Sequence, residues 1–157
     1  MTIKDWLEGL SYKLVQGSLD VEVNEVVYDS RKAAPGAVFV CMKGTKIDSH
    51  DFVGQVTDAG VKVLVTEHAV EAPADVTVVE TANGREALAL LSAARFGYPS
   101  RKLTMIGITG TKGKTTTTHM IKTILETAGK KTGMIGTNGV YIGEEHFPTV
   151  NTTPESY

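Results

Sequence analysis

Residues 107–116 read Gly-Ile-Thr-Gly-Thr-Lys-Gly-Lys-Thr-Thr, and this segment restricts the fold more strongly than any other part of the chain. The apolar run Leu103–Thr109 has the composition of a strand, and apolar residues recur at helical spacing over Lys114–Ala128. A glycine-rich turn from a strand into a helix is the context of a phosphate-binding loop. Glycine brings backbone N–H groups close to an anion, and the helix N-terminus attracts negative charge. We therefore expect this loop to bind the phosphates of a nucleotide.

Two side chains of the loop have specific expected roles. Lys114 would reach the β- and γ-phosphates as the catalytic cation, and the Thr115 hydroxyl would ligate Mg²⁺. The strict pattern would place a glycine at position 108, where this chain has Ile108, so the loop is a variant. A glycine-rich turn can simply connect a strand to a helix without binding a ligand, but Gly-Lys-Thr at this position favours phosphate binding. The residues expected to contact the nucleotide are Gly110, Thr111, Lys112, Gly113, Lys114, Thr115 and Thr116.

The strand before the loop, the helix after it and a returning strand at Thr132–Gly136 predict a βαβ unit with parallel strands. Two strands and one helix cannot cover both faces of a parallel sheet. We therefore expect the chain to be a fragment that ends inside a nucleotide-binding domain beginning at residue 101.

Residues 1–100 predict a separate α/β domain. Apolar residues at spacings of three and four place one face of a helix after Thr2, formed by Ile3, Trp6, Leu7, Leu10 and Leu14. Strands are expected at Val23–Tyr28, Ala37–Met42 and Val61–Val65, with Asp29–Arg31 at the end of the first. A helix after Asp51 should end at Gly60, and a second should run from Asn83, which with Glu86 forms a variant capping box, to about Phe96. A linker follows at Gly97–Ser100.

Composition restricts the partners and the compartment. The 16 Lys and Arg against 18 Asp and Glu give a net charge of −2, which provides no general drive toward nucleic acid or an anionic membrane. The single cysteine, Cys41, excludes an internal disulfide and favours a reducing compartment. The N-terminus lacks the apolar region of a signal peptide, and no stretch approaches the roughly 18 apolar residues of a membrane span. We expect a cytoplasmic protein with a small-molecule partner, no nucleic acid and no membrane insertion.

Segment 107–116 resembles the ATP loop of the Mur ligases, which add amino acids to the nucleotide-linked precursor of the bacterial cell wall. The resemblance extends through Tyr28–Arg31, Pro35–Val40 and Gly44–Phe52, which look like the UDP-binding N-terminal domain, and through Gly136–Gly139 and Asn151–Glu155, which are similar to the member that adds a diamino acid. Lys112 departs from the family, which usually has asparagine there; an added cation beside phosphate should be tolerated. The resemblance implies a small UDP-binding α/β domain, residues 1–100, followed by the first βαβ unit of a P-loop ATPase domain with a parallel sheet, residues 101–157.

The resemblance also implies contacts with a UDP-sugar. Tyr28 and Ser30 would lie at the uridine end, where a tyrosine ring can lie against the base and a serine hydroxyl can donate to a uracil carbonyl. Asp29–Arg31 is also a common turn composition in which Asp29 bonds to its own backbone. The other implied contacts are Thr45, Lys46 and Ile47 near the uridine, and Asn151, Thr152 and Thr153 at the muramoyl sugar or diphosphate.

The four histidines do not have the spacing of a metal site. His50 lies in a segment that resembles the family, and neither the residues nor the resemblance gives it a role. The remaining three, His68, His119 and His146, read as surface residues.

The activity that the resemblance implies is ATP-dependent amide ligation. With ATP and Mg²⁺, the full enzyme would transfer the γ-phosphoryl group to the terminal carboxylate of UDP-MurNAc-L-Ala-D-Glu, where MurNAc is N-acetylmuramate. The amine of a diamino acid, meso-diaminopimelate or L-lysine, would then displace phosphate from the acyl phosphate. Lys114 and the loop N–H groups would offset the repulsion between the two anions. We expect a monomer, and we do not expect the 157-residue chain to ligate by itself.

Other classes of protein contain a similar loop and remain alternatives. The family member that adds D-Ala-D-Ala and a folylpolyglutamate-synthase-like ligase are alternatives, although Asn151–Pro154 and Asp29–Arg31 argue against folate. A P-loop kinase or switch would bind ATP or GTP and have no affinity for a UDP-sugar. A substrate panel separates the ligases, and calorimetry with a UDP-sugar separates the switch.

Overall fold

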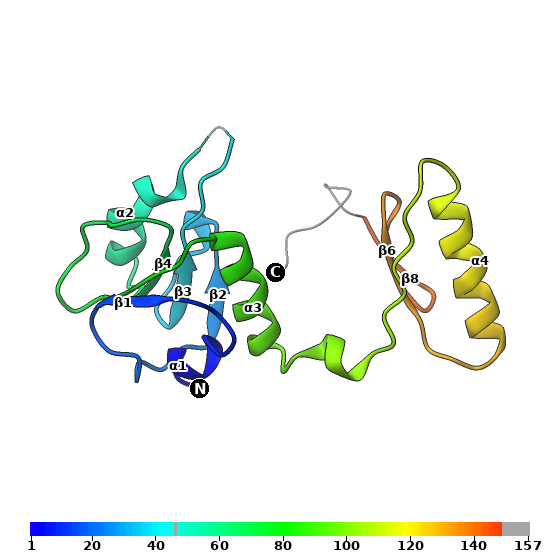
Figure 1. Cartoon of the computed structure of the whole chain (residues 1–157), viewed down its shortest axis with the longest axis horizontal. Coiled ribbons are helices and arrows are strands. Elements are labelled where there is room, and N and C mark those ends of the chain that lie inside the picture. The colour runs from blue at the N-terminus through cyan, green and yellow to red at the C-terminus, as the bar shows by residue number, and fades with distance from the viewer. Residues whose placement is uncertain (46, 149–157) are drawn as a thin grey trace. The chain divides into compact units, whose positions relative to one another are not determined.

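The computed structural model describes residues 1–45 and 47–148, which form two units (Figure 1). The first unit comprises residues 1–103, and the second begins at Thr104. None of the helices in the described part of the chain is both long enough and apolar enough to span a lipid bilayer.

The first unit is an α/β structure built on one five-stranded sheet. Its elements in chain order are α1 (Ile3–Trp6), β1 (Lys13–Gln16), β2 (Glu25–Val27), the 3₁₀ helix η1 (Ser30–Lys32), β3 (Ala37–Val40), the 3₁₀ helix η2 (Ser49–Phe52), α2 (Val53–Asp58), β4 (Val63–Thr66), β5 (Thr77–Glu80), α3 (Gly84–Arg95) and the 3₁₀ helix η3 (Pro99–Lys102). The strand order is β1-β5-β4-β3-β2; the last four are parallel, and β1 joins the edge antiparallel to β5. All residues of β3 and β4 are buried, as expected for a parallel sheet covered on both faces.

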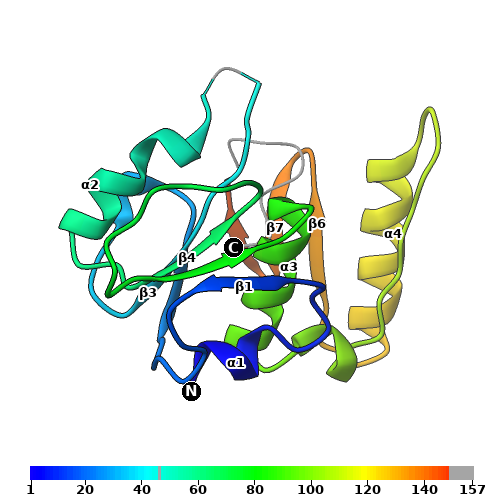
Figure 2. The ribbon, with the colours of Figure 1, turned by 60° about the vertical axis from the view of Figure 1, so that its left-hand side comes forward.

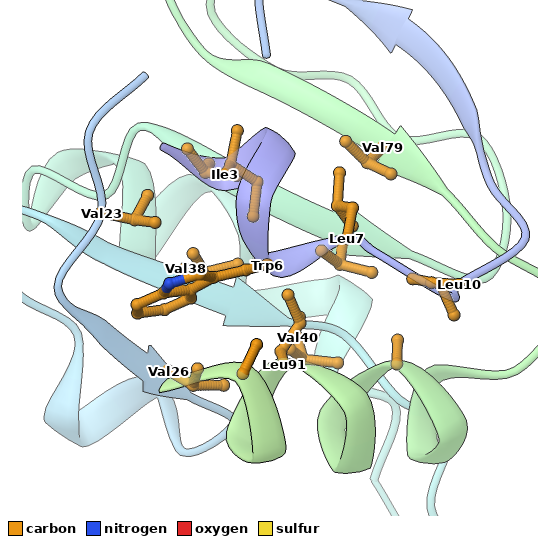
Figure 3. Close-up of a cluster of buried hydrophobic side chains, with 14 of the residues drawn as sticks. Ile3, Trp6, Leu7, Leu10, Val23, Val26, Val38, Val40, Val79 and Leu91 are labelled. Carbon is orange, nitrogen blue, oxygen red and sulfur yellow. The ribbon is translucent and has the colours of Figure 1, made fainter. Parts of the chain in front are cut away.

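Alternate residues of these strands form two hydrophobic clusters, one on each face of the sheet. Val38, Val40, Val63 and Val65 pack with α1 and α3. Figure 3 shows this cluster, with Trp6 lying against Val38. On the other face, strand residues Phe39 and Leu64 pack with Val53 and Val56 of α2. The period-two alternation of a strand thus supplies both faces of the sheet, and the two layers of helix fix its position.

The first helix is shorter than its apolar spacing predicts. α1 ends at Trp6, and the chain turns through Gly9, whose φ of +83° suits a glycine. Leu7 and Leu10 still reach the core, but Leu14 lies in β1 and is 39% exposed, so the prediction that it shares the helix face is wrong. The spacing of three and four continued beyond the turn by coincidence. The expected strands over 23–28, 37–42 and 61–65 and the helix after Asn83 are confirmed, with ends that differ by up to two residues.

The second unit contains α4 (Lys114–Thr127) and a three-stranded antiparallel meander, β6 (Gly133–Gly136), β7 (Gly139–Ile142) and β8 (Glu145–Phe147). The two views in Figures 1 and 2 show α4 alongside this meander. Within the described part of this unit, Met134 is the single buried apolar side chain. Met120 and Ile124 of α4 are 61% and 67% exposed, so the helix presents an apolar face that nothing described covers.

The parallel pairing expected in this unit is not found. The predicted helix and the strand at Gly133–Gly136 are confirmed, but Leu103–Thr109 forms no strand, and β6 pairs antiparallel with β7. A strand needs a neighbour to pair its N–H and C=O groups, and no described segment supplies one to residues 103–109. The two-residue connection between β6 and β7 costs little loop-closure entropy, so local pairing is favoured. The mixed α/β fold class is confirmed. The expected βαβ unit is wrong in the described residues, because its first strand is absent and β6 pairs antiparallel with β7.

Candidate functional site

The carboxyl ends of the parallel strands gather several of the expected site residues of the first unit. Tyr28 follows β2, and the loop with Thr45 and Ile47 follows β3, which is the next strand in the sheet. This loop projects beyond the sheet in Figures 1 and 2. Ligands of open α/β sheets bind at this edge, because the loops there converge. The structure therefore brings Tyr28, Ser30, Thr45 and Ile47 to one edge of one sheet.

Asp29 fixes the segment after β2. Its carboxylate accepts hydrogen bonds from the backbone N–H and the guanidinium of Arg31, at 3.0 Å from N and 2.7 Å from Nη2, and caps η1. The side-chain bond, then the backbone bond, lowers the pKa of Asp29 to about 2. The turn reading of Asp29–Arg31 is confirmed. It leaves the Ser30 hydroxyl without a hydrogen bond among the described residues and therefore available to a ligand. Tyr28 is half-buried and packs against the core cluster around Val38.

In the loop after β3, the described residues on the two sides of position 46 pair with each other. Gly44 N–H donates to the Ile47 carbonyl at 2.9 Å, and the backbones of Lys43 and Asp48 form an isolated antiparallel β-bridge. A Cβ on Gly44 would lie 2.8 Å from the Ile47 carbonyl oxygen, so only glycine fits there without a shift. Ser49 closes the base, because its hydroxyl donates to Met42 O and accepts from Met42 N. Thr45 and Ile47 are exposed at the tip, where a ligand could reach them; Lys46 lies outside the described residues.

Two histidines and a carboxylate lie together beside this loop. The ligand atoms of Asp48, His50 and His68 lie within 4.8 Å of one another, and the two imidazole rings stack with 3.9 Å between centroids. Sequence spacing could not show this group, because η2, α2 and β4 bring His68 back to His50. Both nitrogens of His50 have partners: Nδ1 lies 2.5 Å from Asp48 Oδ1, and Nε2 accepts from Glu67 N–H at 2.9 Å. No lone pair of His50 is left for a metal ion, and the group is better described as a hydrogen-bond network.

Cys41 directly follows β3 and is fully buried. Burial, with the nearby charges of Asp48 and Glu67, raises the pKa of the thiol to about 12. A thiol that stays protonated at neutral pH is a poor nucleophile. Cys41 is therefore a small residue of the core.

The glycine-rich loop of the second unit, residues 107–113, leads into α4. Gly113 is the N-cap of α4 at φ +79°, and Gly110 has φ +150°; both values lie in the region that favours glycine. Lys114 Nζ donates to Gly110 O at 2.6 Å, so its ammonium group lies over the loop. The first turn of α4 contains no acidic residue, and its free N–H groups and dipole favour an anion.

A cavity of about 370 Å³ lies beside this loop. Its walls include Ile108, Lys114 and Thr115, together with residues 134–139, which run from β6 through the turn to the start of β7. In the sequence, segment 136–139 stands out only by its resemblance to the family. In the structure it lines the same cavity as Lys114 and Thr115.

The expected nucleotide contacts are not all equivalent. Lys114 and Thr115 face the cavity, whereas Thr116 borders an open apolar patch of α4 with Met120 and Ile124. Gly110, Thr111, Lys112 and Gly113 form the exposed backbone that precedes the helix. The expected sugar and diphosphate contacts Asn151, Thr152 and Thr153 lie outside the described residues.

Comparison with protein families shows to which family the chain belongs. Residues 22–96 match the model described as Mur ligase family, catalytic domain, and residues 108–157 match the Mur ligase middle domain. The chain belongs to the Mur ligase family. The two matched segments lie in separate units of the structure and include both regions described above.

Individual Mur ligases are similar over much or all of the chain. The UDP-N-acetylmuramoyl-L-alanyl-D-glutamate–2,6-diaminopimelate ligase of Clostridium perfringens is 45% identical over 157 residues, which is 100% of this chain and 32% of that protein. A crystal structure of MurF from Acinetobacter baumannii has a TM-score of 0.63 and 31% identity, over 80% of this chain and 27% of that one. A structure of a 2,6-diaminopimelate ligase, with a TM-score of 0.72 over 99% of this chain and 31% of that one, is 16% identical and supports the fold alone. The chain thus spans about a third of the length of the curated relatives it matches.

Proposed function

We propose that this Mur ligase chain carries the uridine-binding domain, residues 1–100, and the first part of the ATP-binding domain of a ligase that extends UDP-MurNAc-L-Ala-D-Glu by one diamino acid. The observation that carries the proposal is the loop at the start of α4. There Lys114, Thr115 and the turn 136–139 surround one cavity, in a chain that is 45% identical to a 2,6-diaminopimelate ligase.

The residues present fit ATP and Mg²⁺. Two glycines with positive φ open the backbone before α4, and the helix N-terminus and the Lys114 ammonium supply positive potential without an opposing acid in the first turn. Lys114 would hold the β- and γ-phosphates, and the Thr115 hydroxyl would hold Mg²⁺, which neutralises charge on the phosphoryl oxygens when bound. Gly110, Thr111, Lys112, Gly113 and Thr116 complete the proposed contacts. These groups would reduce the repulsion between the triphosphate and the carboxylate that attacks it.

The first unit would hold the other substrate. Tyr28 and Ser30 on one loop and Thr45, Lys46 and Ile47 on the next are proposed to contact the uridine, and Asn151, Thr152 and Thr153 the muramoyl sugar or diphosphate. The Ile47 side chain is exposed, and the Ser30 hydroxyl makes no hydrogen bond to any residue that the structure describes; both features, at the carboxyl edge of the sheet, support the first part of this assignment.

The names of the sequence relatives favour 2,6-diaminopimelate over L-lysine as the added amino acid. The likeness to MurF keeps a D-Ala-D-Ala ligase as the second candidate. We further propose a cytoplasmic, monomeric enzyme.

A substrate panel tests the proposal in the complete protein that contains this chain. With ATP, Mg²⁺ and UDP-MurNAc-L-Ala-D-Glu, 2,6-diaminopimelate should give a tripeptide product by mass spectrometry. Product with D-Ala-D-Ala and the tripeptide precursor, and none with any diamino acid, would support the MurF reading instead.

A further inference from the structure

His50 joins the loop after β3 to Glu67, the residue that follows β4. Its side chain is 3% exposed. Nδ1 contacts the Asp48 carboxylate, which accepts and does not donate when ionised, so Nδ1 must carry the proton. Nε2 faces the backbone N–H of Glu67 at 2.9 Å, so Nε2 must offer its lone pair. The two partners together select the neutral tautomer protonated at Nδ1.

Glu67 extends this network to two further segments. Its Oε2 accepts from Lys43 N–H at 3.0 Å, at the base of the loop, and its Oε1 accepts from Gly84 N–H at 2.8 Å, at the start of α3. A Cβ on Gly84 would lie 2.6 Å from Cys41 O, so α3 approaches the end of β3 closely. Loop 43–48 is therefore fastened at one end by Lys43 to Glu67 and at the other by Asp48 through His50 to Glu67.

We propose that His50 is a positioning residue for uridine binding: it holds the described residues of the loop, 43–45 and 47–48, so that Thr45 and Ile47 are presented to the nucleotide. The inference rests on the proposed function, in which Thr45, Lys46 and Ile47 contact the uridine. A loop that is ordered before binding loses less conformational entropy when the ligand arrives. His50 itself lies beneath the loop and does not need to contact the nucleotide.

Two replacements of His50 separate its two hydrogen bonds. His50→Asn keeps a donor near the position of Nδ1 and loses the acceptor for Glu67 N–H. His50→Gln keeps an acceptor near the position of Nε2 and loses the donor to Asp48. Because the acceptor is the link to β4, His50→Asn should weaken UDP binding about tenfold, and His50→Gln should restore the affinity to within about threefold. His119→Asn is the matched control, since His119 lies on α4 of the second unit, outside this network; its affinity for UDP should stay within about twofold.

Calorimetry with UDP on the 157-residue chain gives these affinities, and Cys41 reports folding, because its buried thiol reacts with a thiol reagent only if the unit opens. In ¹H–¹⁵N spectra, His50→Asn should also shift the amides of Gly44 and Glu67, while the unaltered chain should show His50 protonated at Nδ1. A folded His50→Asn chain with unchanged UDP affinity would overturn the inference. If His50→Asn exposes Cys41, the tautomer and His50→Gln decide: protonation at Nε2, or a folded His50→Gln chain that binds tenfold more weakly, would overturn it.

Absence of UDP binding by the unaltered chain is a different result. It would overturn the proposed function of the first unit, and with it the premise for a positioning role, before any variant is compared.

Discussion

The ammonium group of Lys114 donates a hydrogen bond to the carbonyl oxygen of Gly110, with 2.6 Å between Nζ and O. The two residues stand at opposite ends of the glycine-rich loop, so this bond places a positive charge over the loop backbone. The free N–H groups at the start of α4 lie at the same place. Cation, loop and helix terminus would therefore act on the same anion in the proposed ATP site.

Replacing Lys114 by alanine should remove most turnover of the complete ligase. Loss of one preorganised cation at a transferring phosphoryl group lowers kcat by about 10²–10³-fold. Phosphate release under saturating ATP measures the change. Lys131→Ala is the control, because Lys131 is an exposed lysine of the same unit outside the loop. Near-normal kcat in Lys114→Ala would remove the role assigned to this residue.

Gly113→Ala should weaken MgATP binding about fivefold to tenfold. An alanine at φ +79° costs roughly 1 kcal/mol, and relief of that strain would move the N–H groups that begin α4. A Cβ at this position meets nothing within 4 Å, so the effect comes from the backbone alone. Gly107→Ala is equally free of contacts and has no positive φ, and it should change the affinity much less. Fluorescent nucleotide titration compares the two, and equal effects would contradict this explanation.

Much of the first unit could be predicted from apolar patterning, because β3 and β4 are continuous apolar runs and Asn83 marks the start of α3. β1 and β5 were not predicted. β1 is a four-residue edge strand with an exposed burial pattern, so its sequence lacks the alternation of a half-buried strand. Leu14 was assigned to a helix for the same reason: spacing alone does not show the turn at Gly9. The strand expected over residues 103–109 depends on pairing, which a local pattern cannot supply.

The candidate site also has a part that the sequence could predict and a part that it could not. The glycine-rich loop is contiguous in sequence, so the proposal for Lys114 and Thr115 could be made directly from their order, and both residues line the cavity. The stacking of His68 on His50 and the link through Glu67 connect residues 17 or more positions apart and depend on the return of the chain through β4. No spacing rule contains that information. Segment 136–139 was recognisable only as a resemblance, and the hairpin explains its place at the cavity.

Asn83→Ala should destabilise the first unit by about 1 kcal/mol. The Asn83 side chain accepts hydrogen bonds from the N–H groups of Arg85 and Glu86, and an alanine leaves these two donors of α3 without that cap. Asn83→Asp retains the acceptor and should recover most of the loss. Urea unfolding followed by circular dichroism measures both variants; an Asn83→Ala midpoint equal to that of the unaltered chain would contradict the capping role.

Stability at acid pH should depend on Asp29. Its pKa is about 2 in the folded chain and 3.8 in the reference state, so the folded state favours the ionised form. The resulting stability is complete above pH 3.8 and is lost as the pH falls through about 2. Asp29→Asn should flatten the dependence of Tm on pH in this window, and Asp51→Asn, at an exposed carboxylate of η2, serves as the control. An unchanged slope in Asp29→Asn would show that the pair with Arg31 does not contribute.

The most direct test of the central claim is calorimetric titration of the 157-residue chain with UDP-MurNAc-L-Ala-D-Glu. The account predicts saturable one-to-one binding that UDP competes away. It also predicts that Ser30→Ala weakens this binding about fivefold, through loss of one hydrogen bond, while Ser100→Ala leaves it unchanged. Binding of ATP or GTP without any affinity for the UDP-sugar would contradict the account and support a P-loop switch.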